Sequence, residues 1–262
     1  MSSSSTEKPL VYLILGASGS GRREIVADLI EGGLAETDRP VVLLASNETA
    51  SEADARLGAV VRWTWVDKRI EAGPPDGASH VFFIVDGRAN PVDQIEALKP
   101  WLAGVGAELA RIICVVNCRL AEQHPELLAW YDACIHFSDI VLLNRREGVA
   151  NKWLSEFRRR YEDLFMPCLF EFVKEGRVKN PALLIEPQPR RMSLYFDEDG
   201  SLAVLPEETE YEITDEDGNP VEAGEKENED DEDTGPEVDP YFALDAAGRR
   251  SKRIPDVAKF LS

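Results

Sequence analysis

A glycine-rich loop follows the first apolar run of the sequence. Leu10–Leu15 is continuously apolar, and residues 16–24 after it read GASGSGRRE. Glycines at this spacing allow backbone N–H groups to curl around an anion, and the start of a following helix adds partial positive charge. The spacing therefore predicts a phosphate-binding loop between a buried strand and a helix. Its candidate phosphate-binding residues are Gly16, Ser18, Gly19, Ser20, Gly21, Arg22 and Arg23.

Two positions of this loop depart from the usual pattern. A phosphate-binding loop normally continues with Lys, which reaches the β- and γ-phosphates, and with Ser or Thr, whose hydroxyl binds Mg²⁺. Arg22 and Arg23 stand at those two positions. Arg22 keeps a cation whose planar fork can grip phosphate, whereas Arg23 has no oxygen to offer a metal. We expect anion binding, or descent from it, without fast hydrolysis. The alternative is a tight strand-to-helix turn that binds no ligand.

Few other residues have the spacing of a chemical site. Asp86 ends the apolar run Phe82–Val85, and an acid at such a strand end can hold Mg²⁺ through water. Asp86 is therefore the candidate metal ligand and the candidate for any catalytic role, although an ordinary Asp86–Gly87 turn explains it equally well. The four cysteines and three histidines lack the paired spacing of a zinc site, and Cys114 is expected in the core.

The elements that would position these residues alternate along the chain from Leu10 to about Pro167. A helix is expected over Arg22–Glu31, and Gly32 and Gly33 end it. Strands that alternate with helices predict an α/β fold with a doubly wound, mostly parallel sheet, similar to a P-loop NTPase. Ligands of such sheets bind beyond the carboxyl ends of the strands. The other expected strands are Val41–Ala45, Ala59–Val66, His80–Val85, Arg111–Val116 and Ile140–Leu143, and the other expected helices are Val92–Leu102, Gln123–Ile135 and Val149–Phe165.

The net charge of −20 is distributed unevenly. Residues 1–196 carry 27 acidic and 23 basic side chains, residues 197–240 carry 20 and one, and residues 241–262 carry two and five. A nearly neutral body thus precedes a strongly acidic segment and a short basic end, so the charge does not argue against an anionic ligand on the body. We expect neither a nucleic acid nor a membrane as partner.

Composition also bears on the compartment. The first eight residues, MSSSSTEK, are polar, which is unlike a secretory signal. The longest apolar runs have about six residues, whereas a bilayer span needs about 20. Four cysteines in 262 residues do not make a disulfide framework. We expect a cytoplasmic protein.

Turn sequences follow the alternating body. Met192–Phe196 and Leu202–Leu205 flank the tetrapeptide DEDG at 197–200, and a second DEDG follows Tyr211–Thr214. Asp-Gly turns between apolar runs predict hairpins. Calcium binding would need acids at alternate positions of a 12-residue loop, and these are missing. The expected organisation is a disordered N-terminus (1–9), a P-loop domain (10–190), a short β-hairpin extension (191–222), and an acidic linker with a basic and aromatic tail (223–262).

The tail combines aromatic and basic residues after a flexible spacer. Glu225–Asp239 should be a solvated, self-repelling linker, and DPYFAL at 239–244 and RRSKRIPDVAKFL at 249–261 follow it. A tethered peptide of this kind is commonly a docking motif, so we expect an unidentified protein partner. The alternative is that the tail folds back onto its own acidic segment.

A later strand carries a motif that resembles one in GTPases. Ile140–Leu143 followed by Asn144, Arg145 and Glu147 resembles the strand and the Asn-Lys-x-Asp motif that read guanine. The resemblance implies that Asn144 bonds the base, that the Arg145 stem covers it in place of Lys, and that Glu147 accepts from guanine N1 and N2. The alternative is that Asn144, Arg145 and Glu147 are ordinary residues of a surface loop.

More specifically, Leu10–Phe165 resembles the CobW/HypB/UreG family of metal-chaperone GTPases. The glycine loop matches the family's Gly-x-x-Gly-x-Gly-Lys-Thr except at the two arginines, and Ser46-Asn47-Glu48 stands where the family has an Asn-Glu pair. Residues 83–91, FIVDGRANP, resemble the family's Glu-x-x-Gly-x-Ala-x-Pro stretch, but Ile84 replaces the glutamate. The family's Cys-x-Cys-Cys motif is missing near Leu57–Thr64, which does not favour metal chaperoning.

These observations lead to two main hypotheses. The first is a guanine-nucleotide-binding P-loop protein, similar to CobW-type GTPases, that binds GTP or GDP, hydrolyses little or none of it and acts as a regulator. Whether Mg²⁺ takes part is open at this point. The alternative is a non-catalytic scaffold that has lost nucleotide binding, which the residues at Arg22, Arg23 and Ile84 motivate. An active GTPase that uses arginine in place of lysine is the third and least favoured hypothesis.

Overall fold

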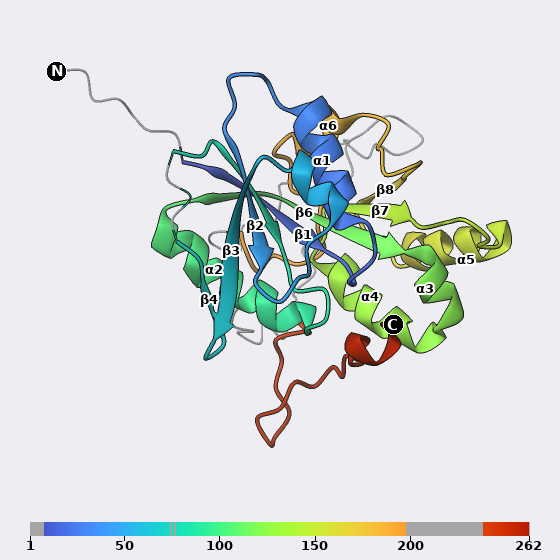
Figure 1. Cartoon of the computed structure of the whole chain (residues 1–262). Helices are drawn as coiled ribbons and strands as arrows, with labels where there is room; N and C mark the ends of the chain where they lie inside the picture. Colours follow the sequence, from blue (N-terminus) through green and yellow to red (C-terminus); the bar gives the residue numbers. More distant parts are fainter. Residues whose placement is uncertain (1–7, 74, 76, 198–237, 262) are drawn as a thin grey trace, which may run out of the picture.

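The computed structural model describes residues 8–73, 75, 77–197 and 238–261. These residues form an eight-stranded sheet with the order β4-β3-β2-β5-β1-β6-β7-β8 (Figure 1). Only β3 and β4 pair in antiparallel fashion among them, and the other neighbours run parallel. The strands are β1 (Leu10–Leu15), β2 (Pro40–Ala45), β3 (Ala59–Val66), β4 (Arg69–Glu71), β5 (His80–Ile84), β6 (Glu108–Asn117), β7 (Ile140–Asn144) and β8 (Leu169–Phe172).

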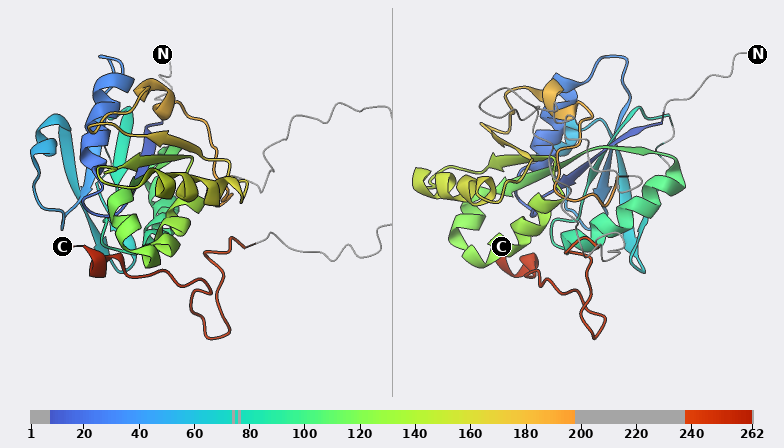
Figure 2. Two further views of the ribbon diagram at one scale, coloured as in Figure 1. Left: turned by 90° about the vertical axis from the view of Figure 1, so that its right-hand side faces the viewer. Right: turned by 180° about the vertical axis from the view of Figure 1, so that it is seen from behind.

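Helices cover both faces of this sheet, as Figure 2 shows. One apolar cluster joins the sheet to α2, α4 and α5, and a second joins the other face to α1 and α6. The predicted doubly wound α/β fold is therefore confirmed. The helices are α1 (Arg22–Gly33), α2 (Pro91–Val105), α3 (Cys118–Gln123), α4 (Leu128–His136), α5 (Asn151–Glu162) and α6 (Pro181–Ile185), with 3₁₀ turns η1 (Glu52–Arg56), η2 (Pro125–Leu127) and η4 (Val257–Phe260).

The central strand β1 explains where the glycine loop lies. Its side chains alternate between the two clusters: Leu13 and Leu15 pack on one side, and Tyr12 and Ile14 pack on the other. A strand that is buried on both faces needs the continuous apolar run seen in the sequence. Because β1 lies between β5 and β6, the loop after Leu15 emerges in the middle of the carboxyl edge of the sheet.

Two predicted elements are wrong. The single helix expected over Gln123–Ile135 is divided, because α3 ends at Gln123 and α4 begins at Leu128. Pro125 stands between them; it lacks an N–H and disfavours helical backbone at the residue before it, so it interrupts the periodic pattern. Met192–Phe196 does not form the first arm of a hairpin. Both DEDG turns, apart from Asp197, and the runs 202–205 and 211–214 lie outside the described residues.

Side chains hold the segment around Met192–Phe196 in place of a strand ladder. Arg191 pairs with the fully buried carboxylate of Asp139 at 3.2 Å and with Asp197 at 2.7 Å. Burial raises the pKa of Asp139, and the Arg191 charge opposes that rise. The Ser193 hydroxyl donates to Asp239 at 2.5 Å. An irregular segment of this kind has no periodicity that could have predicted it.

The tail lies on the body of the molecule. Residues 238–261 run along the ends of α2 and α4 (Figure 1), and Val257 is buried in the cluster on that face. Neither of the two alternatives drawn from the sequence includes this arrangement. No helix in the described part of the chain is long and apolar enough to cross a membrane.

Candidate functional site: a glycine loop closed by its own side chains

The glycine loop connects β1 to α1, and its three glycines have positive φ angles. Gly16, Gly19 and Gly21 have φ angles of 139°, 80° and 91°. A Cβ at Gly16 would overlap the carbonyl oxygen of Val115, and one at Gly21 would overlap the Asn144 amide. Glycine is thus required both for the backbone angle and for the space.

Arg22 reaches across this loop. It is the first residue of α1, only 4% of its surface is exposed, and its guanidinium donates to the Val85 carbonyl oxygen. The same guanidinium donates to Glu48 Oε1 at 2.5 Å. Burial lowers the pKa of Arg22, and the charge of Glu48 opposes that shift. The cation that replaces the usual lysine therefore binds the end of β5 and the loop after β2.

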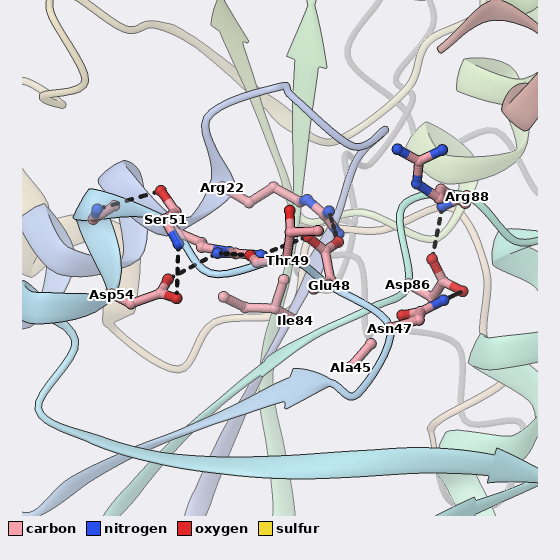
Figure 3. A network of polar contacts seen from close by, with 12 residues as sticks. Arg22, Ala45, Asn47, Glu48, Thr49, Ser51, Asp54, Ile84, Asp86 and Arg88 are labelled. Atoms are coloured by element: carbon pink, nitrogen blue, oxygen red, sulfur yellow. Dashed lines mark hydrogen bonds and ion pairs between the residues drawn. The ribbon is translucent and has the colours of Figure 1, made fainter. Parts of the chain in front are cut away.

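Arg23 binds the same carboxylate from its other side. Its guanidinium pairs with Glu48 Oε2 at 2.7 Å and with Asp54 Oδ1 at 2.9 Å, and it donates to the Thr49 carbonyl oxygen at 2.8 Å. We call the contact of Arg22 and Arg23 with Glu48 the double-arginine bridge; Figure 3 shows this part of the structure. Burial alone would raise the pKa of Glu48, but the two arginines outweigh it and hold that pKa below its usual value.

Two N–H groups of the loop are bonded to backbone carbonyl oxygens. The Ser18 N–H donates to the Gly87 carbonyl oxygen at 3.0 Å, and the Ser20 N–H donates to the Ala17 carbonyl oxygen at 3.1 Å. A Cβ at Gly87 would overlap Ser18 N and crowd the Arg22 guanidinium, so the loop after β5 lies directly against the glycine loop. The buried Ser20 hydroxyl finds no hydrogen-bond partner among the described residues.

Asp86 is engaged in the turn after β5. Its Oδ2 accepts from the Asn47 side chain at 2.7 Å, and its Oδ1 accepts from the Arg88 N–H at 2.9 Å (Figure 3). Gln94, which is 2% exposed, bonds the Asp86 N–H at 2.8 Å. In the described ranges no group of three His, Cys, Asp or Glu side chains could hold a metal. As arranged here, the residues do not fit Mg²⁺, because Arg23 replaces the hydroxyl ligand and Asp86 is already bonded.

The residues predicted to read a base fall into two groups. Asn144 is 6% exposed at the end of β7, and its side chain donates to the Ser20 carbonyl oxygen at 2.8 Å. Arg145 has a φ of 51°, and its guanidinium pairs with Glu24 at 2.9 Å beside Gly21. Asn144 and Arg145 thus contact the glycine loop and α1, whereas Glu147 is exposed.

A small cavity lies at this end of the site. A cavity of about 150 Å³ lies between α1, the loop after β7 and the turn at 174–177. Ligand pockets usually measure about 300–1,000 Å³, so this cavity is smaller than a nucleotide site. It is lined by Glu24, Arg56, Asn144, Arg145, Glu175, Gly176 and Arg177.

Sequence reasoning gave no role to the acids that close the loop. Glu48 and Asp54 follow β2, whose carboxyl end lies at the same edge of the sheet as the glycine loop. Two arginines at a buried helix start require acidic partners, because unpaired buried charges are costly. A search for acids in the loops after the other strands would therefore have pointed to Glu48 and Asp54 as partners of the two arginines.

Comparison with family models finds no match, and comparison with curated proteins finds none either. The chain is similar in structure to the zinc-bound YjiA GTPase from E. coli at 13% identity and a TM-score of 0.38, over 70% of this chain and 67% of that one. A zinc-bound triple mutant of YjiA gives the same identity and coverage with a TM-score of 0.41. The cell division protein FtsY from Thermotoga maritima is similar at 14% identity and a TM-score of 0.41, over 69% of this chain and 68% of that one. Likenesses this distant assign no activity to the chain.

Proposed function

We propose that this chain is a P-loop domain that does not hydrolyse nucleotide and that regulates or scaffolds other proteins through direct contacts. The observation that carries the proposal is the double-arginine bridge, in which Glu48 holds both side chains at the positions of the lysine and the magnesium-binding hydroxyl. The scaffold hypothesis drawn from the sequence is thereby favoured over the nucleotide-binding one.

Charge at the site supports this proposal. The three arginine cations of Arg22, Arg23 and Arg62 lie among the three carboxylates of Glu48, Asp54 and Asp86, so the cluster has no net positive charge before any ligand arrives. A polyphosphate would have to separate Glu48 from both arginines, and removing one partner of a buried ion pair costs about 3–5 kcal/mol. The phosphate would then face three freed or neighbouring carboxylates without a bound metal to neutralise it.

Nucleotide titration tests the proposal. Calorimetry and thermal-shift measurements with GTP and GDP, each with and without Mg²⁺, should give no heat of binding and no shift at millimolar nucleotide. Phosphate release from GTP should stay at the background rate and should not change in an Asp86→Asn variant. Saturable binding, or release that depends on Asp86, would count against the proposal.

A second candidate is binding of guanine nucleotide without turnover. Its support is the phosphate-loop spacing of Gly16, Gly19 and Gly21, their positive φ angles, and the contact of Asn144 with the loop. A phosphate group of GTP or GDP would then replace Glu48 as the partner of the Arg22 guanidinium. In that case we also propose that the chain is related to CobW-type GTPases. The support is that Asn47 and Glu48, which match the family's Asn-Glu pair, both bond residues of the site.

We also propose a cytoplasmic location. All four cysteines are free and buried, and burial raises the pKa of the Cys118 and Cys168 thiols to about 12. Such thiols are inert and suit a reducing compartment.

A further inference from the structure

A partly buried carboxylate holds the tail on the body. Asp239 Oδ2 accepts hydrogen bonds from the Ser193 hydroxyl at 2.5 Å and from His136 Nε2 at 2.9 Å. Its Oδ1 accepts from the Tyr241 N–H at 2.9 Å, which shapes the tail itself. Burial would raise the pKa of Asp239, but these hydrogen bonds outweigh it and lower that pKa. His136 and Ser193 thus form a binding site for one carboxylate group.

Two aromatic side chains follow this anchor. The Tyr241 ring lies 4.9 Å from His136 and 5.7 Å from Phe137, and 8% of its surface is exposed. The Phe242 ring lies 4.4 Å from Tyr195 and 5.4 Å from Phe137. Aromatic anchors beside a satisfied polar contact are what binding hot spots in protein interfaces usually contain.

A salt bridge completes the contact on the α2 side. The Arg250 guanidinium pairs with Glu96 at 2.5 Å and lies 5.1 Å from the centre of the Phe242 ring. The Arg250 side chain thus contacts both Phe242 of the tail and Glu96 of α2.

Between the described parts of the tail and the body, hydrogen bonds are made by side chains. Within the described residues, no backbone-to-backbone hydrogen bond joins residues 238–261 to the rest of the chain. The tail's own backbone bonds are internal, such as the one from the Ser251 N–H to the Ala243 carbonyl oxygen at 2.9 Å. This tail has its own folded shape and contacts the body through side chains, as a bound peptide does. These include Val257, which is buried in the apolar cluster, and Ile254 and Phe260, which pack against it.

The covalent connection to the tail is long and uniformly charged. Residues 198–237 number 40 and include 18 acids and one lysine. A covalent tether makes binding of the attached segment intramolecular and so raises its effective concentration at the site. A modest intrinsic affinity is therefore enough to keep the tail bound in its own molecule, and a competing peptide can replace it.

We infer that the surface formed by His136, Phe137, Ser193 and Tyr195 is a peptide-recognition site, and that Asp239–Phe242 is its ligand in cis. The partner it fits is a protein segment that presents a carboxylate followed, two residues later, by two adjacent aromatic side chains. This inference rests on the protein-binding role proposed above and names the chemistry of the partner.

A cleavable tether tests this inference on the full chain. A specific protease site replaces residues 223–229, which precede the tail in the sequence, and the purified protein is cut there. A fluorescent synthetic peptide of residues 238–261 is then added, and its anisotropy is followed. We expect saturable binding to the cut protein, displacement by unlabelled peptide, and at least about tenfold weaker binding to the uncut protein because the tail competes in cis.

Variant peptides define the recognised chemistry. Asp239→Asn removes the carboxylate that His136 and Ser193 bond and should bind at least about tenfold more weakly, because hydrogen bonds to a charged group are stronger than those to a neutral one. Tyr241→Ala with Phe242→Ala should abolish binding. Arg253→Ala is the matched control, because Arg253 is exposed and forms no ion pair in the described part of the chain, and it should bind as the unchanged peptide does.

Three outcomes would overturn the inference. The cut tail never exchanges, or the cut protein unfolds as its tail leaves, or the uncut protein forms dimers by light scattering and the peptide dissociates them. The first two would make the tail a fixed part of the fold, and the third would make a second copy the occupant. Peptide exchange in a protein that also binds nucleotide would contradict the proposed function alone.

Discussion

Replacing Glu48 by glutamine should destabilise the protein more than the same replacement at an exposed Arg–Glu pair. The change keeps the shape of the side chain but removes the charge that faces two guanidinium groups, of which Arg22 is 4% and Arg23 is 8% exposed. Removing one partner of a buried ion pair costs about 3–5 kcal/mol. We expect about 3 kcal/mol, the lower end, because the amide oxygen still accepts one hydrogen bond and Asp54 still pairs with Arg23.

Urea and thermal unfolding, followed by circular dichroism, measure this loss. At about 2–4 °C per kcal/mol for a domain of this size, the melting temperature should fall by about 6–12 °C. The matched control is Glu31→Gln, also an Arg–Glu pair on α1, in which Glu31 and Arg56 are 47% and 42% exposed. Exposed pairs add little to stability, so this control should melt close to the wild type.

Inorganic phosphate gives a second readout of the same variant. Once Glu48 no longer neutralises the arginines, an oxyanion should bind them and raise the melting temperature of Glu48→Gln more than that of the wild type. The account is refuted if Glu48→Gln melts like Glu31→Gln and responds to phosphate no more than the wild type does.

Two further predictions concern the loop and the pH. Gly21→Ala should lose about 1–3 kcal/mol in urea unfolding, because φ is 91° and the methyl group overlaps Asn144, whereas Gly104→Ala, with open space at its Cβ inside α2, should be neutral or stabilising; equal effects would remove the steric reasoning. The folded-state pKa of Glu48 lies below its usual value of 4.5, so its stabilisation is present above that pH and is lost as the pH falls through the folded-state pKa. Unfolding free energy should therefore fall more steeply below about pH 4.5 in the wild type than in Glu48→Gln, and parallel pH profiles would contradict this.

Much of the fold could be predicted because its signals are local. The apolar runs that became β1, β2, β3, β6 and β7 lie within the strands observed, β3 has the predicted bounds, Ala59–Val66, and β5 ends one residue before the predicted Val85. Strands buried on both faces leave a continuous apolar pattern, and the glycine spacing marks the loop between β1 and α1. The break at Pro125 shows where a proline overrode the periodic pattern that favoured one long helix.

The closure of the site depends on contacts between distant residues. Sequence spacing places Arg22 and Arg23 at a helix start, but it does not reveal that Glu48, 26 and 25 residues away, lies between them. The pairing follows from the order β2-β5-β1, which brings the two loops to the same edge of the sheet. Likewise Asp239 meets His136 across 103 residues, and no local pattern announces such a contact.

The nucleotide content of freshly purified protein tests the central claim most directly. Denaturing the protein and separating the released compounds by ion-pair chromatography reports any nucleotide that the glycine loop retained. If Glu48 occupies the arginines in place of phosphate, the wild type will release no stoichiometric nucleotide. Release of close to one GDP or GTP per chain would contradict the claim that the loop is closed by its own side chains.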